Sequence, residues 1–516
     1  MKRGKSITVM ILILSFLLVS INAESEMKPK NNTKTDNKVL LPVKNDPTIS
    51  FSVWFKVGSQ NDPKGKEGLA NLTTMLLSEG ATKFNTYEQI LEKLYPLAAS
   101  YSGTVDKEMT VFRGRTHKDN LKEFYTLYIQ AILNPAFSET DFTRLKSDVL
   151  NYIENELRYS SDEELGKEAL NRFVFEGTAY EHLTEGTIES VKSITIEDVK
   201  AFYARHFTAG NLVIGIGGGY SKDLPTKLEK DLSILGGTDN ETLPPSAIKP
   251  QPRPIRGMEV NIIDKKCDAT AISFGFPIDV LRGDKDFFAL YLFNSWFGEH
   301  RNQSSHLYQV IREKRGLNYG DYSYIEAFLH GGGLNVPEPN TPRKQQLFEV
   351  WIRPVQHQYK HFALRAAVRE LKKVVQNGLT QEQLDLTKKY LYNYSLFYAQ
   401  TTSKRLGYQL DSKFYGVEDG GNYIELFRQK IKALTLAEVN AAIKKHLQFS
   451  NLKIAIVTSE ASKLASSLSA DAPSPVKYDI PMTDDVLKED KEIEAFQLRI
   501  DPNKIKIFKI EDMFLK

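Results

Sequence analysis

The chain has 516 residues, of which 41% are hydrophobic and 26% charged, ordinary proportions for a soluble globular protein of two to four domains. Its 68 basic and 65 acidic residues leave a net charge of +3, so no excess of positive charge marks it as a nucleic-acid-binding protein. Cys267 is the only cysteine, which excludes an intrachain disulfide and cysteine-based zinc sites.

The amino terminus has the pattern of an export leader. Basic residues near the start precede an apolar run over 7–21, so we expect residues 1–23 to be a secretory signal peptide cleaved after Ala23. The alternative is an uncleaved membrane anchor, although the run is shorter than the roughly 20 residues of a membrane span. Residues 24–38 are polar and charged and predict a disordered tether. The chain is therefore expected to be exported, either periplasmic or secreted, with membrane association as the alternative.

A first domain is predicted over 39–236. It opens with an extended run at 49–59 and an amphipathic helix at 68–80, whose leucines recur on one face. In chain order we then expect a helix over 86–98, extended segments over 99–105 and 108–116, helices over 118–133, 139–159, 163–173 and 196–205, and a strand over 211–217.

The helix at 68–80 presents three positions of particular interest. Asn71 and Met75 lie four residues apart on a face beside the leucine stripe, with Thr74 between them. A zinc protease uses this geometry to place two histidines with a glutamate base beside them. An amide, a thioether and a hydroxyl fill these positions here, so the scaffold is present without the chemistry.

A proline-rich linker separates this domain from a second one. Residues 237–257 hold five prolines, which fix the backbone and remove donors, so we expect an extended boundary segment. The second domain is predicted over 258–470, followed by a tail at 471–516 in which Ile505 and Ile507 alternate with lysines as in a short strand docked on that domain. Its predicted elements are strands at 259–263, 270–276, 319–328 and 347–352 and helices at 284–297, 306–314 and within 363–447.

The two halves repeat each other. Residues 194–216 align without gaps to 434–456, with Thr195 matching Thr435 and His206 matching His446. This repeat predicts a gene duplication and an α+β fold of two homologous domains, each a mixed sheet with helices, arranged as a clamshell. A histidine at the same position of both copies favours packing over catalysis.

Four segments of the sequence resemble a known family. They are VGSQNDPKGKEGLANLTTMLLSEGAT, AYEHLTEGTIESVKSIT, TAGNLVIGIGG and SHLYQVIREKRGLNYGDYSY. With the repeat, they make nearly all of residues 40–460 resemble the insulinase/pitrilysin superfamily of zinc metallopeptidases, most closely its bacterial and mitochondrial-processing-peptidase branch. The resemblance implies the two-domain fold and, in active members, an H-x-x-E-H motif on the first helix.

The resemblance also implies that the zinc site is degenerate. The two histidine positions hold Asn71 and Met75, which are poor zinc ligands, and the position of the base holds Thr74, which cannot activate water near neutral pH. The family's remaining ligand is a glutamate on a later helix, for which Glu154 is the best match and Glu156 the second. One carboxylate cannot hold catalytic zinc, so we expect no metal in this chain.

A second set of family residues is retained. Active assemblies carry an arginine and, seven residues later, a tyrosine, and Arg312 and Tyr319 have this spacing. By resemblance, the two side chains would hold the scissile carbonyl and stabilise its oxyanion. The alternative is a solvated helix residue and a strand-packing aromatic. A separate histidine pair, His357 and His361, is interpreted as incidental surface histidines.

These observations lead to one hypothesis with two alternatives. The chain is expected to be the non-catalytic subunit of a heterodimeric zinc metallopeptidase, whose homologous partner carries zinc and to which Arg312 and Tyr319 are supplied in trans. A peptide substrate would add as an extended strand, with 49–57 as the corresponding strand of this chain. The alternatives are a peptide-binding or scaffold protein and a self-sufficient metallopeptidase with other ligands.

Overall fold

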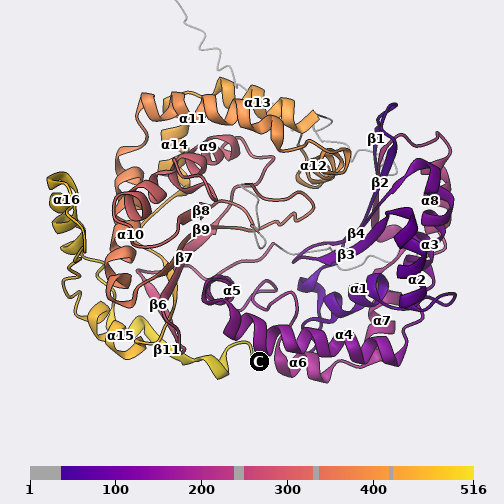
Figure 1. The fold of residues 1–516 in the computed structure, drawn as a ribbon, viewed down its shortest axis with the longest axis horizontal. Helices are drawn as coiled ribbons and strands as arrows, with labels where there is room; N and C mark the ends of the chain where they lie inside the picture. Colours follow the sequence, from indigo (N-terminus) through magenta and orange to yellow (C-terminus); the bar gives the residue numbers. More distant parts are fainter. Residues whose placement is uncertain (1–36, 237–248, 329–335, 418–421) are drawn as a thin grey trace, which may run out of the picture. The chain divides into compact units, whose positions relative to one another are not determined.

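The first half of the chain builds a sheet in the order β1-β5-β2-β4-β3 (Figure 1). In the computed structural model, which describes residues 37–236, 249–328, 336–417 and 422–516, β1 runs parallel to β5 and the other neighbours are antiparallel. The strands are β1 (Lys38–Pro42), β2 (Thr48–Phe55), β3 (Ser100–Val105), β4 (Thr110–His117) and β5 (Leu212–Gly218).

Helices cover this sheet where the sequence predicts them. Leucines of α1 and aromatic residues of α3 pack in one core with β2 and β4, which is the physical reason for the apolar stripe on each of these helices. The helices are α1 (Leu69–Glu79), α2 (Tyr87–Leu94), α3 (Leu121–Leu133), α4 (Glu139–Asn151) with a π-helical continuation (Tyr152–Ser160), α5 (Asp162–Val174), α6 (Ile188–Ser193), α7 (Ile196–His206) and α8 (Leu224–Leu232).

The second half repeats this topology with one strand more. Its sheet has the order β11-β6-β10-β7-β9-β8. The five strands β6-β10-β7-β9-β8 have the same order and directions as β1-β5-β2-β4-β3 in the first sheet, and β11 is added beside β6. The strands are β6 (Glu259–Asp264), β7 (Thr270–Ile278), β8 (Asp321–Tyr324), β9 (Gln346–Val355), β10 (Lys453–Thr458) and β11 (Ile505–Lys509).

The helices of the second half follow the same order. Thr195 and Thr435 begin α7 and α14 with the same capping box, which explains the strongest stretch of the repeat. The helices are α9 (Phe287–Gly298), a π-helical turn (Tyr308–Glu313), α10 (Lys360–Asn377), α11 (Gln381–Tyr394), α12 (Thr402–Tyr415), α13 (Tyr423–Ala433), α14 (Leu436–His446), α15 (Ala461–Ser469) and α16 (Asp484–Glu494).

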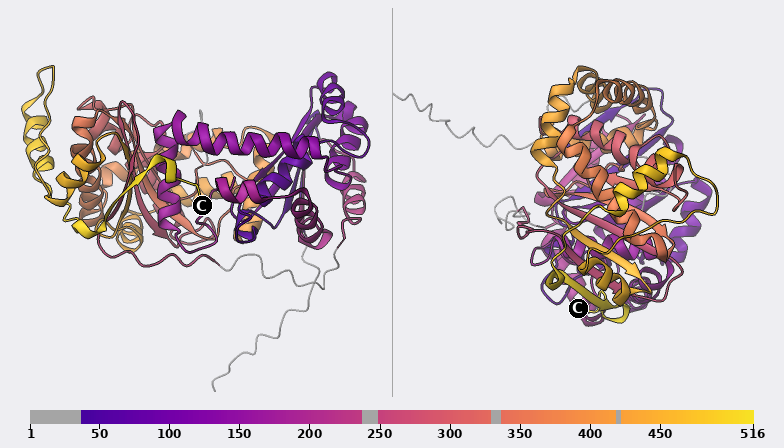
Figure 2. Two further views of the ribbon diagram at one scale, coloured as in Figure 1. Left: turned by 90° about the horizontal axis from the view of Figure 1, so that it is seen from below. Right: turned by 90° about the vertical axis from the view of Figure 1, so that its left-hand side faces the viewer.

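The two halves exchange a helix. Residues Lys38–Lys516 form one unit, within which α5 of the first half packs on β7 and β10 of the second, and α12 of the second half packs on β1, β2 and β5 of the first. The long helix formed by α4 and its continuation leads to α5 (Figure 2). The predicted fold class, two homologous α+β domains facing each other, is therefore confirmed, and each domain contributes a helix to the other.

The predicted tail strand is also confirmed, because β11 pairs in parallel with β6. The signal peptide (1–23), nearly all of the tether (24–38) and the first part of the linker (237–257) lie outside the described residues, and Lys38 already belongs to β1, a strand that the sequence analysis missed. Among the described residues, no helix combines the length and apolar character needed to cross a bilayer.

Candidate functional site

A cavity of about 510 Å³ lies between elements of the two halves. The first half contributes α1, β3, α4 and α5, and the second half contributes β9 and the segments that flank it. Its lining includes Met75 and the polar or aromatic residues Asn71, Glu79, Asp106, Lys107, Asp148, Tyr152, Glu164, Lys167, Glu168, Asn171, Glu185, Phe328, Arg343, Glu349 and Trp351.

The start of α1 is fixed by a glycine and by the carboxylate of Asp62. Gly68 precedes the helix with φ of 97°, and a Cβ there would lie 2.3 Å from the carbonyl oxygen of Glu185, so only glycine fits. The carboxylate of Asp62 accepts hydrogen bonds from the backbone amides of Gly68 and Ala70, both at 2.7 Å. These contacts satisfy free amides of the helix terminus and hold the first turn of α1 beside the cavity.

Of the three positions of the degenerate motif, two line the cavity and one does not. Asn71 and Met75 both line the cavity, and the Asn71 amide nitrogen lies 3.6 Å from the Met75 sulfur. Thr74 is buried away from the cavity, and its hydroxyl donates to the carbonyl oxygen of Ala70 at 2.9 Å. Neither an imidazole nor a carboxylate comes from these positions, so this part of α1 does not fit zinc.

The structure places Glu154 elsewhere. Its carboxylate pairs with the Lys192 ammonium at 2.7 Å, and neither Glu154 nor Glu156 lines the cavity. Asp148 and Tyr152 line it instead, because they are four residues apart on one helix face, whereas a residue two positions beyond Tyr152 falls on another face. Of the two positions, Tyr152 and not Glu154 therefore lines the cavity together with Asn71 and Met75.

Arg312 and Tyr319 also lie outside the cavity. Arg312 belongs to the π-helical turn, where its guanidinium is 4.0 Å from the Glu313 carboxylate and 6.0 Å from the centre of the Tyr308 ring. The Tyr319 side chain is 76% exposed, so it is not a packing aromatic. Neither residue is among those that line the cavity.

The turn that carries Tyr319 is fixed by its neighbours. The Asn318 amide donates to the carbonyl oxygen of Gly320 at 3.2 Å and to the Asp321 carboxylate at 2.8 Å. Gly320 has φ of 151°, and a Cβ there would lie 2.2 Å from the Tyr322 hydroxyl. Tyr319 is therefore exposed on a turn whose conformation is built into the fold.

The cavity lining is predominantly acidic. Its ionisable groups are seven carboxylates and three basic side chains, namely Glu79, Asp106, Asp148, Glu164, Glu168, Glu185 and Glu349 against Lys107, Lys167 and Arg343. Burial raises the pKa of Glu349 to about 7, and burial together with the nearby Arg343 charge lowers the pKa of Lys107. Arg343 and Asp106 pair across the halves through two hydrogen bonds of 2.7 and 2.6 Å.

The prediction that residues 49–57 receive a peptide is wrong. Residues 49–57 include β2, which is paired on one side with β4 and on the other with β5, so no edge is open to a peptide. The edge strand at the cavity is β3, which pairs with β4 and lines the cavity with residues 103–105. The sequence signal for β3 was only a short extended segment, which does not distinguish an edge from a centre.

The remaining histidines do not build a metal site. His361 is buried and His357 bonds to the carbonyl oxygen of Cys267 at 2.9 Å, so the interpretation of this pair as surface histidines is wrong. His206 is buried with its ring centre 4.4 Å from that of Phe202, and burial lowers its pKa to about 4. Over the part of the chain that the structure describes, no three potential ligands gather for a metal ion.

The comparisons with known proteins agree with this fold. Residues 38–188 match the family model described as "Insulinase (Peptidase family M16)", and residues 193–391 match the one described as "Peptidase M16 inactive domain". The chain therefore belongs to the insulinase family, peptidase family M16. The predicted family is confirmed.

Two relatives and one further enzyme subunit illustrate the similarity. A "Non-peptidase homolog YmxG" of Helicobacter pylori is 24% identical over 79% of this chain and 88% of its own length. An uncharacterized zinc protease of Streptomyces coelicolor is 23% identical over 65% of this chain and 69% of its own. The mitochondrial-processing peptidase subunit beta of Dictyostelium discoideum is 22% identical over 59% and 66%.

Solved structures share the fold. The peptidase M16 inactive domain from Pseudomonas fluorescens superimposes with a TM-score of 0.70 at 24% identity, covering 81% of this chain and 94% of that one. A protease from Helicobacter pylori gives a TM-score of 0.69 at 17% identity, with coverages of 82% and 96%.

Proposed function

We propose that this chain is the non-catalytic subunit of an exported, heterodimeric zinc metallopeptidase that acts on peptides. In this proposal a homologous partner with an intact H-x-x-E-H motif holds the zinc ion. This chain supplies Arg312 and Tyr319 to the partner's site, where a guanidinium and a phenol hydroxyl would hold the scissile carbonyl and stabilise its developing charge.

The observation that carries the proposal is the location of the retained pair. Tyr319 is 76% exposed on a fixed turn, and neither it nor Arg312 lines the cavity that holds the degenerate motif. A pair that served this chain's own α1 would be expected to line that cavity. Side chains accessible from outside are suited to a site on another subunit.

Two further observations support the absence of catalysis in this chain alone. Asn71, Thr74 and Met75 offer no zinc ligand set and no base, so no hydrolytic step passes through them. A relative that covers most of this chain is named as a non-peptidase homolog. The relatives named as processing-peptidase subunits favour assembly with a second chain.

The substrate is proposed to bind as an extended strand on β3. β3 is an edge strand and its residues 103–105 line the cavity, so the backbone of a peptide could add to the sheet there while its side chains meet the lining. The excess of carboxylates in that lining favours peptides with basic side chains.

The test is an activity assay with and without a partner. This chain, alone and mixed with a homologous subunit that carries an intact H-x-x-E-H motif, is incubated with a fluorogenic unfolded peptide. We expect no cleavage by the chain alone, cleavage by the pair, and a loss of about 10²–10³ in kcat for Arg312→Ala or Tyr319→Phe. Tyr95→Phe is the matched control, because Tyr95 is 88% exposed on the first half. Full activity of the isolated chain would refute the proposal.

A peptide-binding or scaffold protein is the second candidate, and the cavity with its β3 edge favours it equally. It predicts that peptide binds to this chain alone and that Arg312→Ala leaves the activity of the pair unchanged.

A further inference from the structure

We propose that the carboxyl-terminal segment, residues 471–516, positions Arg312 and Tyr319 through Arg315. This inference rests on the proposed function of that pair and assigns Arg315, Glu489 and Asp490 as positioning residues. None of the three lines the cavity or belongs to the degenerate motif.

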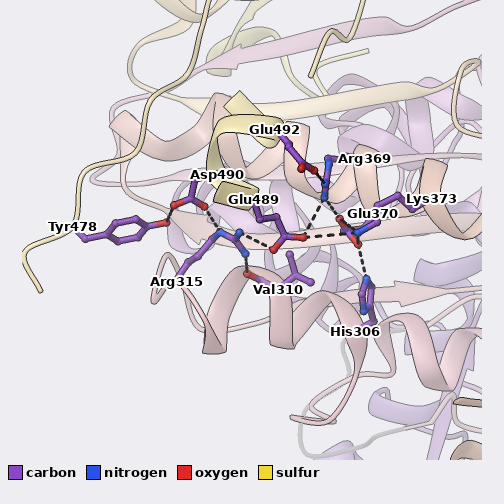
Figure 3. A network of polar contacts seen from close by, with 10 residues as sticks. All are labelled: His306, Val310, Arg315, Arg369, Glu370, Lys373, Tyr478, Glu489, Asp490 and Glu492. Carbon is purple, nitrogen blue, oxygen red and sulfur yellow. Dashed lines mark hydrogen bonds and ion pairs between the residues drawn. The ribbon is translucent and has the colours of Figure 1, made fainter. Parts of the chain in front are cut away.

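In the sequence, Arg315 lies between Arg312 and Tyr319. Its side chain binds the tail directly (Figure 3). Its Nε donates to the Asp490 carboxylate at 2.7 Å, and Nη2 donates to the Glu489 carboxylate at 2.9 Å. Its Nη1 donates to the carbonyl oxygen of Val310 at 2.6 Å, within the π-helical turn that contains Arg312. One guanidinium thus joins α16 to the backbone that carries the retained arginine.

The contact is buried and specific. The Arg315 side chain has 0% exposure, while those of Glu489 and Asp490 have 23% and 11%. A guanidinium makes these three bonds in one plane, which a lysine cannot do. Removing the carboxylates would leave a buried cation without its anionic partners, so the segment would have to rearrange.

A second arginine holds α16 beside the same segment. Arg369 of α10 lies 3.3 Å from the Glu489 carboxylate, pairs with Glu492, and contacts Glu370 at 2.6 Å (Figure 3). The Glu370 carboxylate in turn lies 2.7 Å from Nε2 of His306. Because His306 comes just before the π-helical turn, the tail is connected to both ends of the segment that bears Arg312.

The rest of the tail is anchored on either side of α16. Arg365 binds the Asp471 carboxylate at 2.8 Å and the carbonyl oxygen of Glu494 at 2.6 Å. Further along, β11 pairs with β6, and Arg158 of the first half donates to the carbonyl oxygen of Met513 at 2.8 Å. These anchors fix α16 as part of the fold, so its contact with Arg315 can constrain the segment from 310 to 319.

Hydrogen–deuterium exchange on the full chain tests the positioning without a partner. In the double variant Glu489→Gln/Asp490→Asn, we expect backbone amides of 311–320 to exchange at least about tenfold faster, while those of β10 keep their rate. The matched control is Glu492→Gln, which removes a carboxylate of the same helix that contacts Arg369 and not Arg315. Unchanged exchange over 311–320 in the double variant, or an equal increase in the control, would overturn the inference.

The activity of the mixed pair separates this inference from the proposed function. We expect the double variant to lower kcat about tenfold with KM within about threefold of wild type. The conservative variant Asp490→Glu, which keeps a carboxylate at this position, should lose less activity than the double variant. If Tyr319→Phe lowers activity and the double variant does not, the positioning role is overturned and the proposed function stands. If neither variant changes activity although exchange increases, the proposed function fails, and with it the role of the positioned pair.

Discussion

The amide nitrogen of Asn71 lies 3.6 Å from the sulfur of Met75 across one turn of α1, and both side chains face the cavity. The two positions that hold zinc ligands in active family members thus contact each other here. The cavity is therefore a binding space lined by both halves, in which these two positions offer no hydrolytic metal site.

Restoring the ligands should restore metal binding. In the triple variant Asn71→His, Met75→His and Tyr152→Glu, two imidazoles and a carboxylate would face one cavity, the ligand set of a catalytic zinc site. We expect about one zinc ion per chain by elemental analysis after dialysis, against a background value for wild type.

A control variant tests whether position 152 is the one that supplies the third ligand. The control carries the two α1 substitutions and leaves Tyr152 unchanged, so that the third ligand would have to be a native carboxylate, either Glu154 or one that lines the cavity, such as Asp148. We expect its zinc affinity to be lower by about 10–100-fold. Equal affinity would show that a native carboxylate serves as well as position 152, which for Glu154 would require it to leave its pairing with Lys192.

The ion pair between the halves should contribute strongly to stability. Arg343 and Asp106 are both buried and share two hydrogen bonds, so Arg343→Ala would leave a buried carboxylate without its partner. We expect the free energy of unfolding to fall by about 3–5 kcal/mol, measured by urea denaturation. The double variant Asp106→Asn/Arg343→Met should lose less, because no buried charge remains. An equal loss in both variants would contradict this account.

The helix exchange should depend on small residues in β5. A Cβ at Gly215 would lie 2.9 Å from the Leu410 side chain of α12 and 2.9 Å from the Ser52 carbonyl oxygen. We expect Gly215→Ala to destabilise the protein by about 1–3 kcal/mol, measured by thermal unfolding. Gly236→Ala is the control, because nothing lies within 4 Å of its added Cβ. A stability change of the same size in both variants would argue against the packing explanation.

Stability should fall between acidic and neutral pH in part because of Glu299. Burial raises the pKa of this carboxyl from 4.5 to about 7 in the folded protein. The folded state therefore holds the proton more tightly than the unfolded state, so this contribution to stability is present below pH 4.5 and is lost as pH rises through 7.

The variant Glu299→Gln should remove this dependence. We expect it to raise the free energy of unfolding at pH 8 by up to about 3 kcal/mol and to flatten the curve between pH 5 and 8. The measurement is urea denaturation at each pH. If the free energy of unfolding changed by the same amount between pH 5 and 8 in the wild type and in the variant, the assignment to Glu299 would be contradicted.

Much of the local structure follows from short-range patterns in the sequence. The capping boxes at Thr195 and Thr435 begin α7 and α14 where the repeat predicts them, because an N-cap is satisfied within four residues. The alternation at Ile505 and Ile507 likewise predicted β11. The loss of the zinc motif was readable directly, since a ligand is determined by the residue type at one position.

Long-range relationships were decided by the tertiary structure. The apolar stripes of α5 and α12 predict that each helix packs on a sheet, but periodicity does not say which sheet, and each packs on the other half. The placement of Tyr152 rather than Glu154 at the cavity depends on the rotation of one long helix, which a motif spacing does not specify. The contact of Arg315 with Asp490 joins residues 175 positions apart, so it exists only once the tail is packed against α10. Sequence patterns determine which face of an element is buried, whereas the partner of that face is determined by the packing of the whole chain.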